Sequence, residues 1–158
     1  MDFSLSNEQQ ALREAIRDFA EEEIRPLAAE MDRTDEFPMH LWTRLGDMGL
    51  LGIGVPEVYG GSEGDLWTAV LAGEEVAAAS SSVALSMGAH SNLCVYNLFR
   101  NGSEAQKKRY LPDVCAGTRI GCLGITEPDT GSDAVGMTTQ ARRDGEYYVL
   151  NGAKTWIT

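Results

Sequence analysis

The residue pattern of this chain changes near Thr118. Before that position, apolar side chains recur at helical spacing, and Ser6 with Gln9 has the pattern of a helix-capping box. After it, short apolar and aromatic runs flank a turn at 143–145, which is typical of a β-hairpin. Helices followed by strands predict an α+β protein, with an all-helical bundle domain over 1–117 and the beginning of a β domain over 118–158.

Proline and glycine divide the helical part into segments. Pro26 removes a backbone donor, so the first helix either kinks there or restarts as a second helix. The glycine-rich stretch 49–65 indicates a long ordered connection, and Ser103 with Gln106 repeats the capping pattern. We expect helices from about residue 7, over 41–48, over 66–80, over 82–100 with a C-cap at 101–102, and over 103–115.

The β part has more strand-like runs than it can pair. The run IGCLGIT is β-compatible, and we expect strands in MTTQARR, EYYVLN and KTWIT. The last run has no visible partner strand, and unpaired edges are costly and promote aggregation. We therefore expect the chain to be a fragment of a longer protein.

Charge and hydropathy argue against several classes of function. The chain has 13 Lys+Arg against 24 Asp+Glu, and its formal net charge of -11 repels polyanions, so no nucleic-acid partner is expected. The opening MDFSLSNEQQ resembles neither a secretory signal nor a transit peptide, and no apolar run reaches the ~18–20 residues of a membrane helix. We expect a cytoplasmic protein without membrane insertion.

Cysteine and histidine usage gives no sign of a metal site or a disulfide framework. Cys94, Cys115 and Cys122 include no CxxC pair, and we expect all three to be buried packing residues. The chain has two histidines, His40 and His90, too few for a zinc site without paired cysteines. Cys94 and His90 stand four residues apart, as a nucleophile pair could, but no orienting group or oxyanion hole accompanies them.

The segment LGITEPDTGSD, at 123–133, combines a proline, acidic residues and hydroxyls with no basic residue. Pro128 biases Glu127 toward an extended backbone, and Gly131 lets a ligand approach the chain closely. Hydroxyls and backbone N–H groups in this loop can donate to a polar heterocycle or to a phosphate. An ordinary turn between strands has a similar composition, and composition alone favours that simpler interpretation.

The same segment resembles the signature of the acyl-CoA dehydrogenase family: a small residue, an aliphatic residue, Ser/Thr, Glu, a short variable stretch and Gly-Ser/Thr-Asp. It departs at Thr130, where the family usually has a smaller residue such as Ala. The stretches FSLSNEQQALREAIRDFA, VPEVYGG, RNGSEAQKKRYLP and YVLNGAKTWIT are similar to family stretches in the same order. The run SMGAHSNLC, at 86–94, is particularly similar to isovaleryl-CoA dehydrogenases.

This resemblance implies a helical domain over 1–117, the start of a middle β-barrel domain over 118–158, and a C-terminal helical domain that the chain lacks. It implies that FAD is the cofactor. Trp156 would pack on the isoalloxazine ring, Thr126 and Thr158 would contact its polar edge and N5, and Ser132 would also contact the CoA portion of the substrate. The implied cofactor-binding residues are Leu123, Gly124, Ile125, Thr126, Gly131, Ser132, Trp156, Ile157 and Thr158.

The implied reaction is α,β-dehydrogenation of a short or branched acyl-CoA to the trans-2-enoyl-CoA, with electrons passed to electron-transfer flavoprotein. The family's catalytic glutamate lies in the C-terminal domain, so no catalytic residue is expected in this chain, which alone should be inactive. The full-length protein is expected to be a homotetramer. An acyl-CoA oxidase or flavin monooxygenase of the same fold, and a truncated helical interaction module without flavin, are the alternatives.

Five further residues invite functional interpretations. Glu127 could act as a base, but the family pattern makes it a structural part of the loop. Glu74 and Glu75 could be paired carboxylates, but adjacent helical residues point about 100° apart, which favours separate structural roles. Leu85 and Met87 stand where the resemblance places the floor of the acyl pocket, although plain core residues would look the same.

Overall fold

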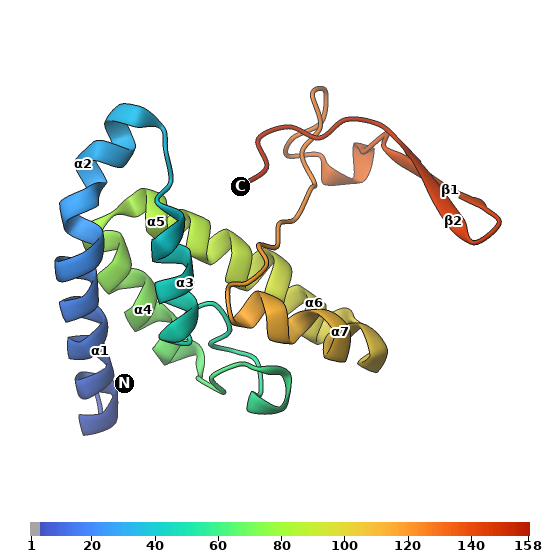
Figure 1. The fold of residues 1–158 in the computed structure, drawn as a ribbon. Helices are drawn as coiled ribbons and strands as arrows, with labels where there is room; N and C mark the ends of the chain where they lie inside the picture. Colours follow the sequence, from blue (N-terminus) through green and yellow to red (C-terminus); the bar gives the residue numbers. More distant parts are fainter. Residues whose placement is uncertain (1–3) are drawn as a thin grey trace. The chain divides into compact units, whose positions relative to one another are not determined.

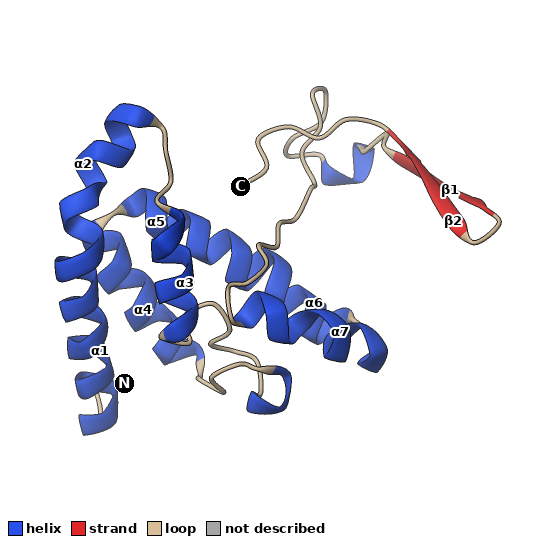
Figure 2. Ribbon diagram, viewed as in Figure 1, coloured by secondary structure: helices blue, strands red, loops and turns tan. Residues whose placement is uncertain are grey.

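The computed structural model describes residues 4–158. It divides into two compact units, Met1–Gly121 and Cys122–Thr158 (Figure 1). The first unit is helical and the second contains a β-hairpin (Figure 2), which confirms the predicted α+β class. Residues 1–3, which open the expected helical domain, lie outside the described residues.

Side-chain caps fix where the first and last helices of the helical unit begin. Helix α1 (Asn7–Phe19) follows Ser6, whose hydroxyl accepts from the Gln9 N–H while the Gln9 side chain accepts from the Ser6 N–H. Helix α7 (Glu104–Cys115) follows Ser103, which exchanges the same two bonds with Gln106. Both predicted capping boxes are confirmed.

The first long helical run changes its winding before Pro26. Helix α1 passes into a π-helical segment, η1 (Ala20–Ile24), and then into α2 (Arg25–Thr34), with Pro26 in the first turn of α2. A proline is tolerated there because the first N–H groups of a helix have no partner in the helix. Of the two predicted outcomes, the helix therefore restarts.

The glycine-rich connection joins α3 (Met39–Asp47) to α4 (Leu66–Ala79) and contains one short 3-10 turn, η2 (Glu57–Tyr59). Gly61 is required in this connection, because a Cβ there would overlap the carbonyl group of Val55. The Asp65 carboxylate accepts from the Thr68 N–H and caps α4. The predicted ordered connection is confirmed.

The helix predicted over 82–100 is not uniform. It consists of α5 (Ser81–Gly88), a π-helical segment η3 (Ala89–Tyr96) and α6 (Asn97–Asn101). Gly102 ends α6 in an extended conformation, not in the left-handed C-cap that an Asn-Gly pair suggests. Single-sequence periodicity cannot separate α from π winding, because the two differ by less than one residue per turn.

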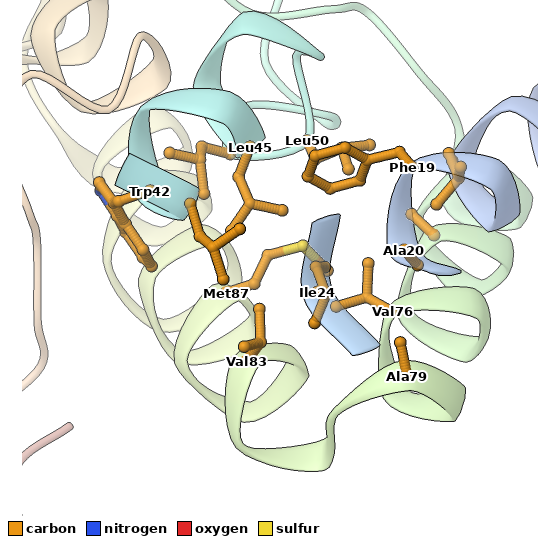
Figure 3. Close-up of a cluster of buried hydrophobic side chains, with 14 of the residues drawn as sticks. Phe19, Ala20, Ile24, Trp42, Leu45, Leu50, Val76, Ala79, Val83 and Met87 are labelled. Atoms are coloured by element: carbon orange, nitrogen blue, oxygen red, sulfur yellow. The ribbon is translucent and has the colours of Figure 1, made fainter. Parts of the chain in front are cut away.

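The larger hydrophobic cluster lies between α1, η1, α3, α4 and α5 (Figure 3). Phe19 and Ile24 from the first run pack with Leu45 of α3, Val76 of α4 and Met87 of α5. A smaller cluster joins the connection and η3 to α7, with Val55, Val95 and Leu111 buried together. These two clusters contain all the buried apolar residues assigned to a core in residues 4–158 except Leu71.

The second unit contains a 3-10 turn, η4 (Ala134–Gly136), and two antiparallel strands, β1 (Gln140–Asp144) and β2 (Tyr147–Asn151). Their register pairs Arg142 with Val149, and Gly145 adopts φ +61° in the turn. The strand expected in KTWIT does not form, the β-compatible run IGCLGIT is not a strand either, and the strand in MTTQARR begins only at Gln140. The reason is pairing: within residues 4–158 these runs have no partner strand, as the unpaired edge of KTWIT suggested.

No helix of residues 4–158 combines the length and the apolar character that crossing a bilayer demands.

Candidate functional site

Glu127 is the centre of a hydrogen-bond cluster in the second unit. Its side chain is 4% exposed. The backbone N–H and the hydroxyl of Thr138 donate to Oε2 at 2.7 and 2.8 Å, and the Thr139 N–H and Lys154 Nζ donate to Oε1, each at 2.9 Å. Hydrogen bonds from Thr139 and Thr138, with that from Lys154, hold the pKa of this carboxyl well below its usual range. A carboxylate so fully engaged is structural, as the family pattern suggested.

The signature segment lies beside the two residues that precede the second segment predicted to contact the flavin, 156–158. The Thr155 N–H donates to the carbonyl oxygen of Thr126 at 3.0 Å. One residue earlier in each segment, Lys154 Nζ donates to the carbonyl oxygen of Ile125 at 2.9 Å. A Cβ on Gly124 would lie 3.4 Å from Cγ of Lys154, so Gly124 also lies beside this lysine. The structure thus brings 124–126 next to 154–155.

The residues after Thr155 present their side chains to solvent. Trp156 is 90% exposed and adopts φ +56°, in the left-handed region that side-chain-bearing residues rarely occupy. Ile157 and Ile125 are each 37% exposed. Thr158 is exposed as well, while Thr126 is half-buried. Exposed apolar and aromatic groups beside exposed backbone form a surface suited to a flat heterocycle.

The glycine-rich end of the signature packs less closely against the rest of the second unit. Gly131 and Ser132 are exposed, and a Cβ on Gly131 would meet open space. Thr130 exchanges backbone hydrogen bonds with Glu127 at 2.8 and 3.1 Å, and its hydroxyl donates to the Gly136 carbonyl at 3.4 Å. The departure from the family pattern at Thr130 therefore adds a contact within the loop. Leu123 is half-buried and Gly124 is exposed at the other end of the signature.

The helical unit contains a separate cavity of about 660 Å³, bounded by the glycine-rich connection, α4, α5 and η3. Leu85 and Met87, the two residues predicted at the floor of an acyl pocket, both line it. Of the described residues that line it, Asp65 is the only charged one, and its carboxylate is engaged in capping α4. A cavity of this size with no uncommitted charge suits an apolar chain.

The two adjacent glutamates of α4 have separate environments, as predicted. Glu74 is exposed, whereas Glu75 is 7% exposed and receives hydrogen bonds from Arg13 at 2.5 Å and from Arg17 at 2.9 Å. The bond from Arg17, together with that from Arg13, lowers the pKa of Glu75 to about 2. This carboxylate joins α4 to α1 and has no acid–base role.

His90 is buried and has no lone pair left for catalysis. Its Nδ1 accepts from the Gly121 N–H at 2.9 Å, so Nε2 carries the proton and donates to the Val114 carbonyl at 2.9 Å. Burial lowers the pKa of His90, which keeps the ring neutral. Since both ring nitrogens bind backbone, the Cys94–His90 nucleophile pair is not formed as a catalytic dyad.

The prediction of three buried cysteines is correct only for Cys115. Burial raises the pKa of that thiol to about 11, while Cys94 is half-buried and Cys122 is exposed at the start of the second unit. None of the three forms a disulfide. In the part of the chain that the structure describes, no group of His, Cys, Asp and Glu side chains could hold a metal ion.

Lys154 is the site residue that sequence reasoning missed. A lysine two positions before an aromatic residue gave no reason to connect it with Glu127, 27 residues earlier. The one available signal was charge: a predicted structural glutamate in a loop without basic residues needs a cation from elsewhere in the chain.

Comparison with known proteins shows which family this chain resembles in sequence and in fold. The chain matches the N-terminal domain of acyl-CoA dehydrogenases over residues 6–118 and their middle domain over 122–158. This chain is 48% identical to a mitochondrial isovaleryl-CoA dehydrogenase from Pongo abelii, and the match covers 98% of this chain. Its fold is similar to that of a glutaryl-CoA dehydrogenase in complex with glutaryl-CoA, with a TM-score of 0.94, 38% identity and 99% of this chain covered. An acyl-CoA dehydrogenase from Bacillus anthracis, solved with FAD, has a TM-score of 0.92, 36% identity and 98% coverage.

These matches define the class of protein: the chain belongs to the acyl-CoA dehydrogenase family. It spans 37% of the Pongo abelii enzyme, 40% of the glutaryl-CoA dehydrogenase chain and 27% of the Bacillus anthracis chain. The similarity therefore covers the whole of this chain and less than half of each relative.

Proposed function

We propose that this chain is the N-terminal helical domain (1–117) and the start of the middle β domain (118–158) of an FAD-dependent acyl-CoA dehydrogenase. Its substrate would be a short or branched acyl-CoA, converted to the trans-2-enoyl-CoA. The observation that carries the proposal is the pairing of the signature segment at Thr126 with the segment at Thr155. The 48% identity to an isovaleryl-CoA dehydrogenase supports the substrate class.

The residues near this pairing fit a flavin. A bound FAD would supply the acceptor for a hydride from the acyl chain. Trp156 offers an exposed aromatic face, and the exposed backbone and hydroxyls of the signature loop offer donors to the polar edge of a ring. The proposed cofactor-binding residues are Leu123, Gly124, Ile125, Thr126, Gly131, Ser132, Trp156, Ile157 and Thr158, with Ser132 also contacting the CoA portion of the substrate.

The cavity beside Leu85 and Met87 is the proposed site for part of the acyl chain. An acyl group lacks charge, and burial of its methylene groups would stabilise binding by about 0.8 kcal/mol for each CH₂ removed from water. The lining offers apolar contacts without an uncommitted charge that the acyl chain would desolvate.

Other parts of the proposed enzyme would lie beyond these residues. The base that removes the Cα proton, the contact surface for electron-transfer flavoprotein and the interfaces of a homotetramer are not assigned to residues 4–158. We therefore expect the 158-residue chain alone to bind FAD weakly and to show no acyl-CoA turnover. Strong turnover by the isolated chain would contradict this expectation. The cytoplasmic location stays a prediction, since the Pongo abelii relative is named as mitochondrial.

Trp156→Leu in the complete protein, as the cell makes it, tests the flavin surface. We expect FAD affinity to fall by roughly tenfold, because a stacked indole contributes about 0.5–1.5 kcal/mol beyond its buried area. Fluorescence titration of FAD measures the effect. Tyr147→Leu is the matched control, because Tyr147 is an aromatic residue, 77% exposed, on β2 of the same unit. Equal FAD affinities of the two variants and the parent would contradict the assignment of Trp156.

The same preparation separates the related activities. With isovaleryl-CoA, butyryl-CoA and glutaryl-CoA as substrates, a dehydrogenase reduces an electron-transfer flavoprotein or a dye and reacts slowly with O₂. Rapid peroxide formation would indicate an oxidase, and a hydroxylated product would indicate a monooxygenase. A colourless protein that binds no FAD and forms a stable oligomer would instead support the helical interaction module.

A further inference from the structure

The ammonium group of Lys154 has a complete set of partners. It donates to the Ile125 carbonyl oxygen at 2.9 Å, to Glu127 Oε1 at 2.9 Å and to Met137 Sδ at 3.2 Å. An ammonium group has three N–H donors, so these three acceptors account for all of them. Lys154 is 26% exposed and Glu127 4%. The group is therefore committed to the protein and is not free to bind a substrate phosphate.

Lys154 and Thr155 hold the signature segment at two successive residues. The Lys154 side chain binds the Ile125 carbonyl, and the Thr155 N–H binds the Thr126 carbonyl. One hydrogen bond between two segments leaves rotation about that bond free, whereas two bonds at neighbouring residues also fix the relative direction of the segments. Without Lys154, the Thr155 bond alone would remain and would act as a pivot.

The Lys154 bond also sets the orientation of one peptide group. In a trans peptide, the C=O of Ile125 and the N–H of Thr126 point in opposite directions. Because the Ile125 carbonyl faces Lys154, the Thr126 N–H faces the other way. No hydrogen bond donated by this N–H occurs within residues 4–158, so it remains available to an acceptor outside them.

Glu127 keeps the lysine head in place. Its carboxylate is itself fixed by the N–H and the hydroxyl of Thr138 and by the N–H of Thr139, at 2.7–2.9 Å. The opposite charges of Glu127 and Lys154 cancel, so the pair adds no net charge to the segment that leads into Trp156. A neutral, rigid support is the arrangement that orients a ligand without competing for it.

We propose that Lys154, with Glu127 as its fixed counter-charge, is a positioning residue that sets the angle between the 125–126 and 156–158 segments and directs the Thr126 N–H toward the flavin. This inference rests on the proposed function and extends it to a residue outside the cofactor-binding set. Lys154 acts through the backbone of Ile125 and Thr126, and it is not a catalytic residue.

Lys154→Met in the complete, FAD-loaded protein is the test, since methionine keeps an unbranched stem and removes the charge and the donors. We expect FAD affinity to fall by about tenfold or more, as for the loss of a charged hydrogen bond. At saturating FAD, the visible circular dichroism of the bound flavin should also change, because its protein surroundings are rotated. Lys154→Arg, which keeps the charge but not the tetrahedral set of donors, should restore part of both signals.

Arg142→Met is the control, because it removes one exposed positive charge from β1 of the same unit. It should leave FAD affinity and the flavin dichroism unchanged. If Lys154→Met fails to fold, the double variant Glu127→Gln with Lys154→Met leaves no unpaired buried charge and should show the same losses.

The outcomes separate this inference from the proposed function. A parent protein that binds no FAD would overturn both. A parent that binds FAD, with Lys154→Met or the double variant retaining its affinity and its flavin dichroism, would overturn the role of Lys154 alone. A fall in thermal stability with unchanged dichroism at saturating FAD would show that Lys154 only stabilises the fold, which also overturns the positioning role.

Discussion

At the scale of single residues, each unit contains, among residues 4–158, one buried carboxylate that is paired with basic side chains. Glu75 in the helical unit is held by Arg13 and Arg17, and Glu127 in the second unit by Lys154. Burying a charge is costly unless it is paired and hydrogen-bonded, so each carboxylate specifies which segments must meet. Glu75 of α4 binds Arg17 of α1, which lies 58 residues earlier in the sequence. Glu127 joins the signature loop to Lys154, near the end of the chain.

The Glu75 site predicts a definite dependence of stability on pH. Because the folded state lowers the pKa of Glu75 to about 2, its contribution is fully present above the unfolded-state pKa near 4.5 and is lost as the pH falls toward 2. Glu75→Gln should lower the free energy of unfolding at pH 7 by roughly 1–2 kcal/mol, because both arginines stay partly solvated. Urea unfolding at pH 7 and pH 3 should show a smaller difference at pH 3.

Glu74→Gln is the matched control for that measurement, because Glu74 is the exposed neighbour on the same helix. Its unfolding free energy should stay within about 0.5 kcal/mol of the parent at both pH values. An equal loss in the two variants would mean that the ion pairs with Arg13 and Arg17 contribute nothing specific.

At the scale of secondary-structure elements, the capping boxes are the best-determined features. Ser103→Ala removes the acceptor for the Gln106 N–H at the start of α7, and it should cost about 1 kcal/mol of unfolding free energy. Chemical denaturation followed by circular dichroism measures this loss. Ser82→Ala, at an exposed position inside α5, should have almost no effect. A Ser103→Ala variant as stable as the parent would show that α7 depends on tertiary packing alone.

Local sequence signals located these elements better than they described their winding or pairing. Ser6 and Ser103 mark helix starts because a cap needs only residues three positions apart. The π winding of η3 and the missing strand at KTWIT depend on contacts that no local window contains. In the candidate site, the signature residues followed from the family resemblance. The Lys154–Glu127 pair did not, because its members are 27 positions apart in the sequence and meet only in the folded structure.

At the scale of the whole molecule, the apolar core is distributed unequally. Every buried hydrophobic residue among residues 4–158 lies in the first unit, and Glu127 is the only buried residue of the second. We therefore expect a fragment of residues 1–121 to unfold cooperatively and to keep its helical circular dichroism. A fragment of residues 122–158 should show no cooperative transition, since a lone hairpin is marginally stable.

Amide hydrogen exchange of the intact chain checks the same point at residue resolution. Amides of α1, α4 and α5 should exchange most slowly, and those of β1 and β2 should exchange close to the rates of an unfolded chain. Slow exchange throughout the hairpin would contradict the view that polar contacts alone organise the second unit.

The same distribution of buried groups affects what calorimetry can measure. The heat-capacity increment of unfolding arises mainly from apolar surface that becomes exposed to water. Because the second unit buries a carboxylate and no apolar side chain, its opening would add almost nothing to the heat-capacity increment of unfolding. The heat-capacity increment measured for this chain would thus report the unfolding of the helices, and the paired segments at 124–126 and 154–155 would open without adding to it.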